Sequence, residues 1–179
     1  MDLLTYKKTK CLDFTEEYEI RLFNIFMTLN KNYGATYMSY TFDKANTVRY
    51  SFRSDSSWAS VYHNEKIAGK PIIESCPLDI ISREKKSMFI IWDLYCHESQ
   101  PKTYREIMGM REDVGLSHGL TLSTYFGDHH DAIAIATDEK KNDLATNILL
   151  SDNGLSLKNS LLECRKELFE AFKNNITLV

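Results

Sequence analysis

The segment that decides the fold is REDVGLSHGLTLSTYFGDHHDAIAIAT, residues 111–137. It contains two short apolar stretches, LTLSTYF (120–126) and DAIAIAT (131–137), and a turn signal at Gly127-Asp128 lies between them. Stretches of this length and composition, separated by such a turn, predict two antiparallel strands joined by a hairpin. A charged helix end precedes them, and Gly115 is suited to end that helix with a positive φ. The segment therefore predicts a helix that leads into an antiparallel sheet.

The rest of the chain supplies helices and strands around this hairpin. Helical spacing of apolar residues predicts a long, well-buried helix from Asp13 to Gly34 that includes Phe23 and Met27. Further helices are expected near Trp58, after Pro71, over 103–115 and over 155–174, the last with Leu161, Leu162, Leu168, Phe169 and Phe172 on one side. Strands are expected over 35–43, 47–52 and 87–95. This order predicts one α/β domain over residues 1–179, a three-layer α-β-α sandwich with a central antiparallel sheet, as in PAS and GAF sensor domains.

Composition excludes several classes of protein. The chain has 179 residues, of which 43% are hydrophobic and 26% charged, and a net charge of −3, which argues against a surface that binds a phosphate backbone. The first ten residues are too polar for a secretory signal, and no apolar run approaches the roughly 20 residues of a membrane span. The four cysteines lie far apart, without a C-x-x-C pair. We therefore expect free thiols and a cytoplasmic protein that does not contact a membrane.

Reactive residues give little support for catalysis. His129 and His130 are adjacent, so in a strand they point to opposite faces and do not share a metal ion. We interpret them as surface residues of the hairpin turn, and we expect no metal and no cofactor. The chain has no G-x-S-x-G, P-loop, H-E-x-x-H or G-x-G-x-x-G motif, so we do not expect an enzyme. A small enzyme that uses Cys96, His97 or the histidine pair stays open as an alternative.

Aromatic residues are more informative. Trp58, Tyr62 and Trp92 accompany further rings at Tyr40, Phe42, Tyr50, Phe52 and Tyr125. One interpretation is an aromatic core whose polar tips bond to backbone or water. The other is a closed apolar cavity in which a few polar tips orient a ligand. The residue pattern alone leaves both open.

A family resemblance favours the cavity. The run WASVY (58–62), the helix that opens at Pro71, Trp92, VGLSHGLTL (114–122), the Gly-Asp turn and AIAIAT together resemble the autoinducer-binding domain of LuxR-type quorum-sensing regulators. The resemblance covers residues 14–174, and Gly115-Leu116-x-x-Gly119-Leu120-Thr121 is its most specific part. It implies a sensor that holds an acyl-homoserine lactone between the sheet and a helical layer. Trp58 would donate its indole N–H to the lactone carbonyl, and the lining would include Tyr62, Trp92, Tyr40, Tyr50 and Thr121.

Four positions depart from the family pattern, so the hydrophobic shell is kept while much of the polar anchoring is altered. Lys70 stands where the family has the aspartate that accepts the ligand amide N–H, and lysine cannot accept a hydrogen bond. Ser54 replaces a tyrosine, Ala134 replaces a serine or threonine, and Ser123 replaces a proline. We therefore expect either a ligand other than a standard acyl-homoserine lactone or the loss of ligand dependence. Glu74 or Asp79 could supply the missing carboxylate.

LuxR-type regulators carry a helix-turn-helix domain after the sensor, whereas this sequence ends at NNITLV. We therefore expect no DNA-binding domain within the chain and DNA contact through a further domain alone. Two explanations stay open: the chain is the sensor of a longer regulator, or it is a stand-alone sensor that pairs with full-length relatives. The resemblance also implies a homodimer formed through the first or the last helix.

Overall fold

The computed structural model describes residues 16–44, 48–64, 87–95, 102–127, 129–138 and 143–176. Five strands form the sheet: β1 (Tyr37–Lys44), β2 (Val48–Arg53), β3 (Met88–Ile91), β4 (His118–Phe126) and β5 (His129–Thr137). The helices are α1 (Glu16–Tyr33), α2 (Ser57–Asn64), α4 (Lys102–Glu112), α5 (Leu144–Asp152) and α6 (Leu155–Ile176), and a 3-10 turn, η1 (Trp92–Tyr95), follows β3.

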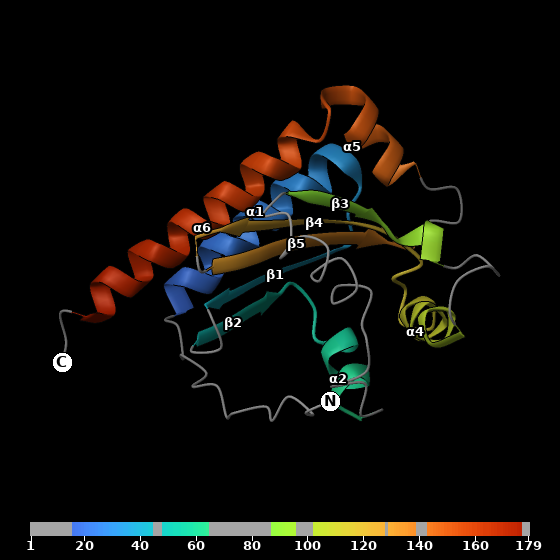
Figure 1. Cartoon of the computed structure of the whole chain (residues 1–179), viewed down its shortest axis with the longest axis horizontal. Coiled ribbons are helices and arrows are strands. Elements are labelled where there is room, and N and C mark those ends of the chain that lie inside the picture. The colour runs from blue at the N-terminus through green and yellow to red at the C-terminus, as the bar shows by residue number, and fades with distance from the viewer. Residues whose placement is uncertain are drawn as a thin grey trace.

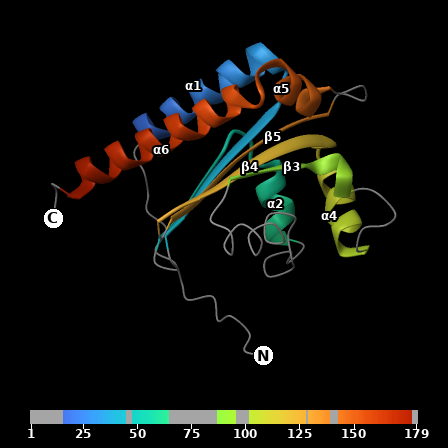
Figure 2. The same cartoon turned by 45° about the horizontal axis from the view of Figure 1, so that its top comes forward.

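The sheet is antiparallel throughout, with strand order β2-β1-β5-β4-β3. Helices α1, α5 and α6 cover one face, and α2 and α4 lie on the other (Figures 1 and 2). The predicted three-layer α/β sandwich with a central antiparallel sheet is therefore confirmed. None of the helices in the described ranges is long and apolar enough to cross a membrane.

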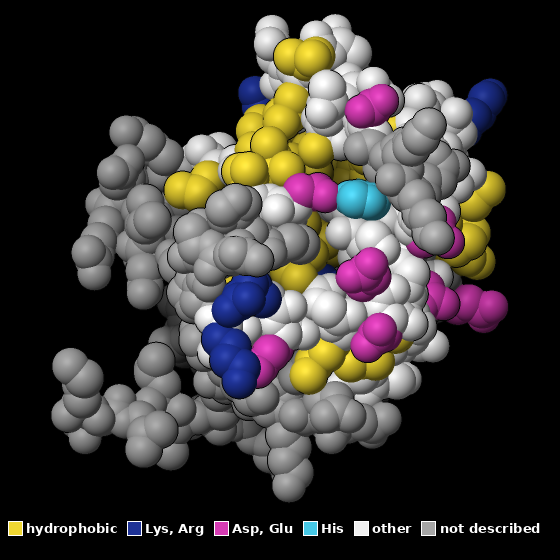
Figure 3. Space-filling view, turned by 90° about the vertical axis from the view of Figure 1, so that its right-hand side faces the viewer, with side chains coloured by type: hydrophobic (Ala, Val, Ile, Leu, Met, Phe, Trp, Pro, Cys, Tyr) yellow, Lys and Arg dark blue, Asp and Glu magenta, His cyan; other side chains and the backbone are white. Residues whose placement is uncertain are grey.

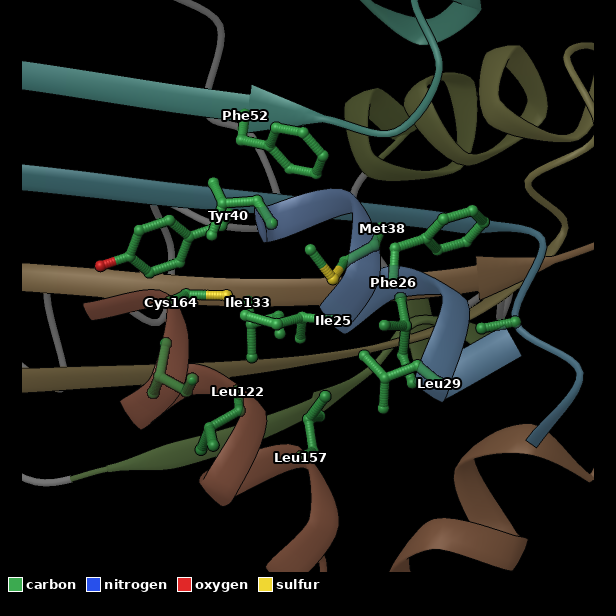
Figure 4. Close-up of a cluster of buried hydrophobic side chains, with 14 of the residues drawn as sticks. Ile25, Phe26, Leu29, Met38, Tyr40, Phe52, Leu122, Ile133, Leu157 and Cys164 are labelled. Atoms are coloured by element: carbon green, nitrogen blue, oxygen red, sulfur yellow. The ribbon is translucent and has the colours of Figure 1, made fainter. Parts of the chain in front are cut away.

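The face under α1, α5 and α6 holds the larger hydrophobic core. Alternate residues of the strands point into it, because successive side chains of a strand point to opposite faces. Figure 4 shows side chains of α1 and α6 packed against this face, among them Ile25, Phe26 and Cys164 against Met38, Tyr40 and Ile133. The buried residues of this core also include Phe42, Tyr50, Phe52, Leu120, Leu122, Ile135, Leu157, Leu161 and Leu168.

A buried ion pair fixes α6 to the sheet. The Asp131 carboxylate is fully buried, and Arg165 donates to both of its oxygens, from Nε and from a terminal nitrogen, at 2.8 Å each. The Thr124 hydroxyl also donates to Asp131, at 2.5 Å, and the Arg165 guanidinium lies 3.8 Å from the ring centroid of Phe126. Because Arg165 donates two hydrogen bonds to the same carboxylate, the pair fixes the position of α6 along β5.

Several sequence expectations differ from the structure. Residues 87–95 are not one strand: β3 ends at Ile91, and Trp92 begins η1. Helix α5 was not predicted, and the expected strand at 131–137 begins two residues earlier, at His129. Leu162 is exposed rather than packed with its neighbours on α6, and Phe23 and Met27 are exposed on α1. Gly34 and Gly115 do take the expected positive φ, 73° and 78°. The helix expected after Pro71 lies outside the described residues.

Candidate functional site

The sheet face toward α2 and α4, here called the inner face, is formed mainly by small side chains. Three cross-strand rows run over β1, β5 and β4: Tyr37–Ala136–Gly119, Ser39–Ala134–Thr121 and Thr41–Ala132–Ser123. Eight of these nine positions carry Gly, Ala, Ser or Thr, and we call these eight residues the floor. The opposite face carries Met, Tyr, Phe, Leu and Ile at the alternating positions. Because these side chains are small, any group that covers the inner face can approach the strand backbone closely.

The centre of this floor is buried despite its small side chains. Ala132 and Ala134 are 8% and 4% exposed, and Thr121 and Ser123 are 1% and 2% exposed. Its alanine methyl groups are apolar, while its hydroxyl groups offer hydrogen bonds at fixed points. An apolar surface with a few oriented polar groups is typical of small-molecule sites.

Both tryptophans of the chain lie at one end of the floor. Trp92 packs over Gly119, and its indole nitrogen donates a 2.8 Å hydrogen bond to the Thr121 hydroxyl. Trp58, on α2, belongs to the same buried cluster. The Arg111 guanidinium lies over both indoles, 5.1 Å from the ring centroid of Trp58 and 4.0 Å from that of Trp92. The structure therefore brings together the two predicted residues, Trp58 and Trp92, and it places beside them Arg111, which sequence analysis missed.

Arg111 could have been found by helical spacing. It lies three and four residues after Met108 and Ile107, and seven after Tyr104, all of which are buried. This spacing places it on the buried side of α4. A charge at such a position is usually assigned to solvent, which is why the pattern did not reveal it.

The far end of the floor carries a buried polar pair. The Ser123 hydroxyl and His130 Nε2 are 2.7 Å apart, and the His130 ring lies 4.7 Å from that of Tyr125. Both members of the pair are buried. The expectation that the two histidines decorate the surface is wrong. His130 faces the floor, and His129 packs against Phe42 and Phe126 on the other face, because β5 extends back to His129.

The other expected site residues are distributed as follows. Ala134 and Thr121 lie on the floor. Tyr40 and Tyr50 lie on the opposite face, in the core under α1 and α6, so the structure does not bring them to the tryptophans. Ser54 extends the pairing of β1 with β2: its hydroxyl accepts from Met38 N–H at 2.8 Å, and its own N–H donates to Met38 O at 2.9 Å. The Tyr62 side chain and Lys70, Glu74, Asp79, Cys96 and His97 lie outside the described residues.

Burial sets the protonation of the core groups under α1 and α6. It raises the pKa of Tyr40 far above its ordinary value, and the nearby Asp131 charge raises it further. It likewise raises the pKa of the fully buried Cys164 thiol. A thiol held neutral is a poor nucleophile, so Cys164 is not a reactive centre. Among the described residues, no group of three His, Cys, Asp or Glu side chains could hold a metal ion.

Two open pockets lie at the sheet edge near His118. The first, of about 320 Å³, lies against α5 and is lined by Ile91, Asp93, His118, Gly119, Ala145, Thr146, Leu149 and Leu150. The second, of about 440 Å³, is lined by Glu112, Gly115, Ser117, His118 and Asp138. Figure 3 shows this side, where a histidine lies beside an acidic side chain below apolar atoms, and His118 Nδ1 contacts Asp93. Neither pocket includes a tryptophan, and Gly119 is the one floor residue that lines the first pocket.

Comparison with protein-family models found no match, and neither did comparison with curated protein sequences. Among solved structures, SdiA in complex with octanoyl-rac-glycerol is similar at TM-score 0.62 and 15% identity, over 87% of this chain and 61% of that one. Escherichia coli SdiA in space group P6522 is similar at TM-score 0.57 and 14% identity, over 89% of this chain and 62% of that one. CepR2 from Burkholderia cenocepacia, an N-acylhomoserine lactone-dependent LuxR-family transcription factor, gives TM-score 0.48 and 11% identity, over 82% and 93%.

SdiA and CepR2 are LuxR-family proteins with autoinducer-binding domains. The SdiA comparisons confirm that the chain has the fold of such a domain, as the sequence resemblance implied. The chain spans about three fifths of the length of the two SdiA chains that it matches.

Proposed function

We propose that the chain is a ligand-sensing regulatory domain of LuxR type that binds a small amphiphile with its apolar tail over the floor. The observation that carries the proposal is the buried strip of small residues beside two indoles. Transfer of the tail's own apolar surface from water to the floor would drive binding, at roughly 25 cal/mol per Å² of surface buried. The fold of SdiA holds octanoyl-rac-glycerol, a compound with one acyl tail and a polar head, and this supports the choice of ligand class. The role is binding rather than catalysis, in the cytoplasm.

We propose further that the ligand is not a standard acyl-homoserine lactone. Ala134 has no hydroxyl with which to bond a head group, and the Ser54 side chain is engaged by the backbone of β1. Lys70 in the sequence cannot accept the amide N–H that the family's aspartate accepts. Three polar anchors that the resemblance implies are therefore replaced.

The proposed assembly is a homodimer formed through α1. Ile20, Phe23 and Met27 are 54%, 43% and 47% exposed and follow one another at intervals of three and four residues along the helix. Such a stripe on a helix suits the same stripe of a second copy. DNA contact would need a further domain, and pairing with a longer relative through α1 is the alternative arrangement. Sedimentation of Phe23→Glu against wild type tests the interface.

Fluorescence titration tests the binding proposal directly, because both tryptophans of the chain lie at the floor. We expect octanoyl glycerol to change the emission with a saturable curve, and N-octanoyl homoserine lactone to bind at least tenfold more weakly. Ala134→Leu fills the floor and should abolish binding, whereas Ala145→Leu makes the same change on α5, on the other side of the sheet, and should not. Equal binding by both variants would contradict the floor as the site, and tight lactone binding would contradict the altered ligand preference.

A further inference from the structure

The pocket of about 320 Å³ between α5 and the sheet edge, here called the α5 pocket, lies away from the tryptophans. The side chain of His118 shares a sheet face with that of Leu120, because alternate residues of a strand point to the same face. Leu120 belongs to the core under α1, α5 and α6, so the α5 pocket opens on that side of the sheet (Figure 2). Its volume falls at the lower end of the range of about 300–1,000 Å³ that is usual for small-molecule sites.

His118 and Asp93 form a polar wall of the α5 pocket. His118 Nδ1 contacts Asp93 Oδ1, and a carboxylate can only accept, so Nδ1 is the donor of this hydrogen bond. The other nitrogen of the neutral ring, Nε2, is then an acceptor. A carboxylate has about four acceptor sites, and the Asp93 side chain is 44% exposed, so it has capacity for a further donor. The polar wall therefore offers acceptors to a ligand.

The opposite wall of the α5 pocket is apolar. It consists of Ile91, at the end of β3, and of Leu149 and Leu150 on α5. Ile91 and Leu149 are partly buried and pack against the core, whereas Leu150 is 80% exposed. Figure 3 shows apolar atoms directly beside the histidine and an acidic side chain. An apolar group that covers Leu150 would remove leucine surface from water, which favours binding.

The charge around the pocket determines which kind of ligand suits the acceptors. His118 also lines the neighbouring pocket of about 440 Å³, together with Glu112 and Asp138. Among the described residues that line these two pockets, three are carboxylates and none is lysine or arginine. At low ionic strength such a region attracts a cation and repels an anion. An ammonium group has three donors and no acceptor, so it complements the polar wall in both charge and hydrogen bonding.

We propose that the α5 pocket binds a small organic cation, a primary amine with a short apolar tail. The ammonium group donates to the Asp93 carboxylate and to His118 Nε2, and the tail lies along Leu149 and Leu150. Asp93 is the residue that determines head-group specificity. This site goes beyond the proposed function, because it lies on the α5 side of the sheet and takes a cation.

The test titrates the wild-type chain with hexylamine, 1-hexanol and hexanoate at pH 8, where the amine is an ammonium ion. Two-dimensional 1H–15N NMR reports both the affinity and the position of each bound compound. We expect hexylamine to bind about two- to fivefold more tightly than hexanol, the range of a partly exposed ion pair, and hexanoate to bind most weakly. Amide shifts should concentrate at Gly119 and along α5, and the preference should shrink as the salt concentration rises to about 0.3 M.

Three results of these titrations overturn the inference: no binding by hexylamine, equal binding of hexylamine and hexanol, or amide shifts that lie away from the α5 pocket. None of them affects the proposed function, because octanoyl glycerol is titrated separately and its site is the floor. Failure of octanoyl glycerol would in turn leave the amine site standing.

Paired variants then assign the two parts of the ligand. Asp93→Asn should remove the hexylamine preference, whereas Glu163→Gln, which removes an exposed carboxylate from α6, should keep it. Leu150→Ser should weaken hexylamine and hexanol alike, whereas Leu162→Ser, at an exposed leucine of α6, should change neither. A full preference in Asp93→Asn, or wild-type affinity for both compounds in Leu150→Ser, overturns the inference. If Asp93→Asn does not fold, the result for Leu150→Ser decides, since its side chain lies mostly in solvent.

Discussion

Gly119→Ala should destabilise the domain, although alanine is the smallest possible addition. Gly119 lies on the floor beneath the Trp92 ring, and an added Cβ would lie 2.5 Å from Trp92 Cδ2 and 2.8 Å from Cζ3, and closer still to Cε3. Carbon atoms do not approach so closely, so the indole must move. Its hydrogen bond to Thr121, 2.8 Å long, and its contact with Arg111 would be lost with that movement.

The expected cost follows from two contributions. Overpacking a filled core costs about 1–3 kcal/mol, and a broken buried hydrogen bond costs about 1–3 kcal/mol more when the partner stays buried. Some relaxation of the ring offsets the sum, so we expect the free energy of unfolding to fall by about 2–4 kcal/mol. In a chain of this size, each kcal/mol lost from the free energy of unfolding lowers the melting temperature by roughly 2–4 °C.

Gly109→Ala is the matched control, because it makes the same chemical change at a different kind of position. Gly109 lies inside α4, and no described heavy atom lies within 4 Å of a Cβ built there. Alanine in a helix interior is more stable than glycine by about 0.5–1 kcal/mol, so this variant should be slightly stabilised.

Urea unfolding followed by circular dichroism measures both variants, and tryptophan emission reports the displaced ring. A Gly119→Ala protein with the wild-type midpoint and emission would refute the placement of Trp92 over Gly119. So would equal destabilisation by the two substitutions.

Two further predictions concern the core under α1 and α6. Arg165→Met should lower the free energy of unfolding by about 3–5 kcal/mol, because it leaves the Asp131 carboxylate buried without its cation, and the Asp131→Asn/Arg165→Met double variant should recover part of that loss in urea unfolding. The free energy of unfolding should also fall as pH rises through about 10, because burial raises the pKa of Tyr18 and of Tyr40, so these phenols ionise in the unfolded chain while they stay neutral in the native one. Urea titrations at pH 8, 10 and 11 measure this slope, which Tyr18→Phe should reduce; a stability independent of pH over this range would contradict the prediction.

The sequence predicted the layers of the fold because they depend on local periodicity. Gly34 and Gly115 mark where helices end, and the hairpin of β4 and β5 follows from its two apolar stretches and the intervening turn. Strand alternation also shows that Tyr40 shares a face with Phe42. It does not show which helical layer that face meets, since this depends on pairings between residues far apart in sequence. Tyr40 and Tyr50 were therefore placed with the tryptophans, whereas they lie on the other side of the sheet.

The missed residues of the candidate site are those whose chemistry conflicts with their position. Arg111 has the spacing of a core residue and the charge of a surface residue, and His130 lies in a strand that continues beyond its apolar part. Average preferences assign both to solvent. A pattern-based interpretation therefore fails where a polar group is held inside, which is also where a binding site needs one.

The two faces of the sheet differ in the size of their side chains, and this difference is the physical basis of the candidate site. Large side chains pack α1 and α6 on one face, and the Asp131–Arg165 pair joins α6 to β5. The inner face is then free to carry alanine, serine and threonine, which contribute little packing of their own. A guest on the floor would pack against these small side chains, and because it binds the native state alone, it would raise the free energy of unfolding as its concentration rises above the Kd. Under the proposed function, sensing would be a change in the stability of the layer formed by α2 and α4, whose Trp58 and Arg111 lie beside Trp92.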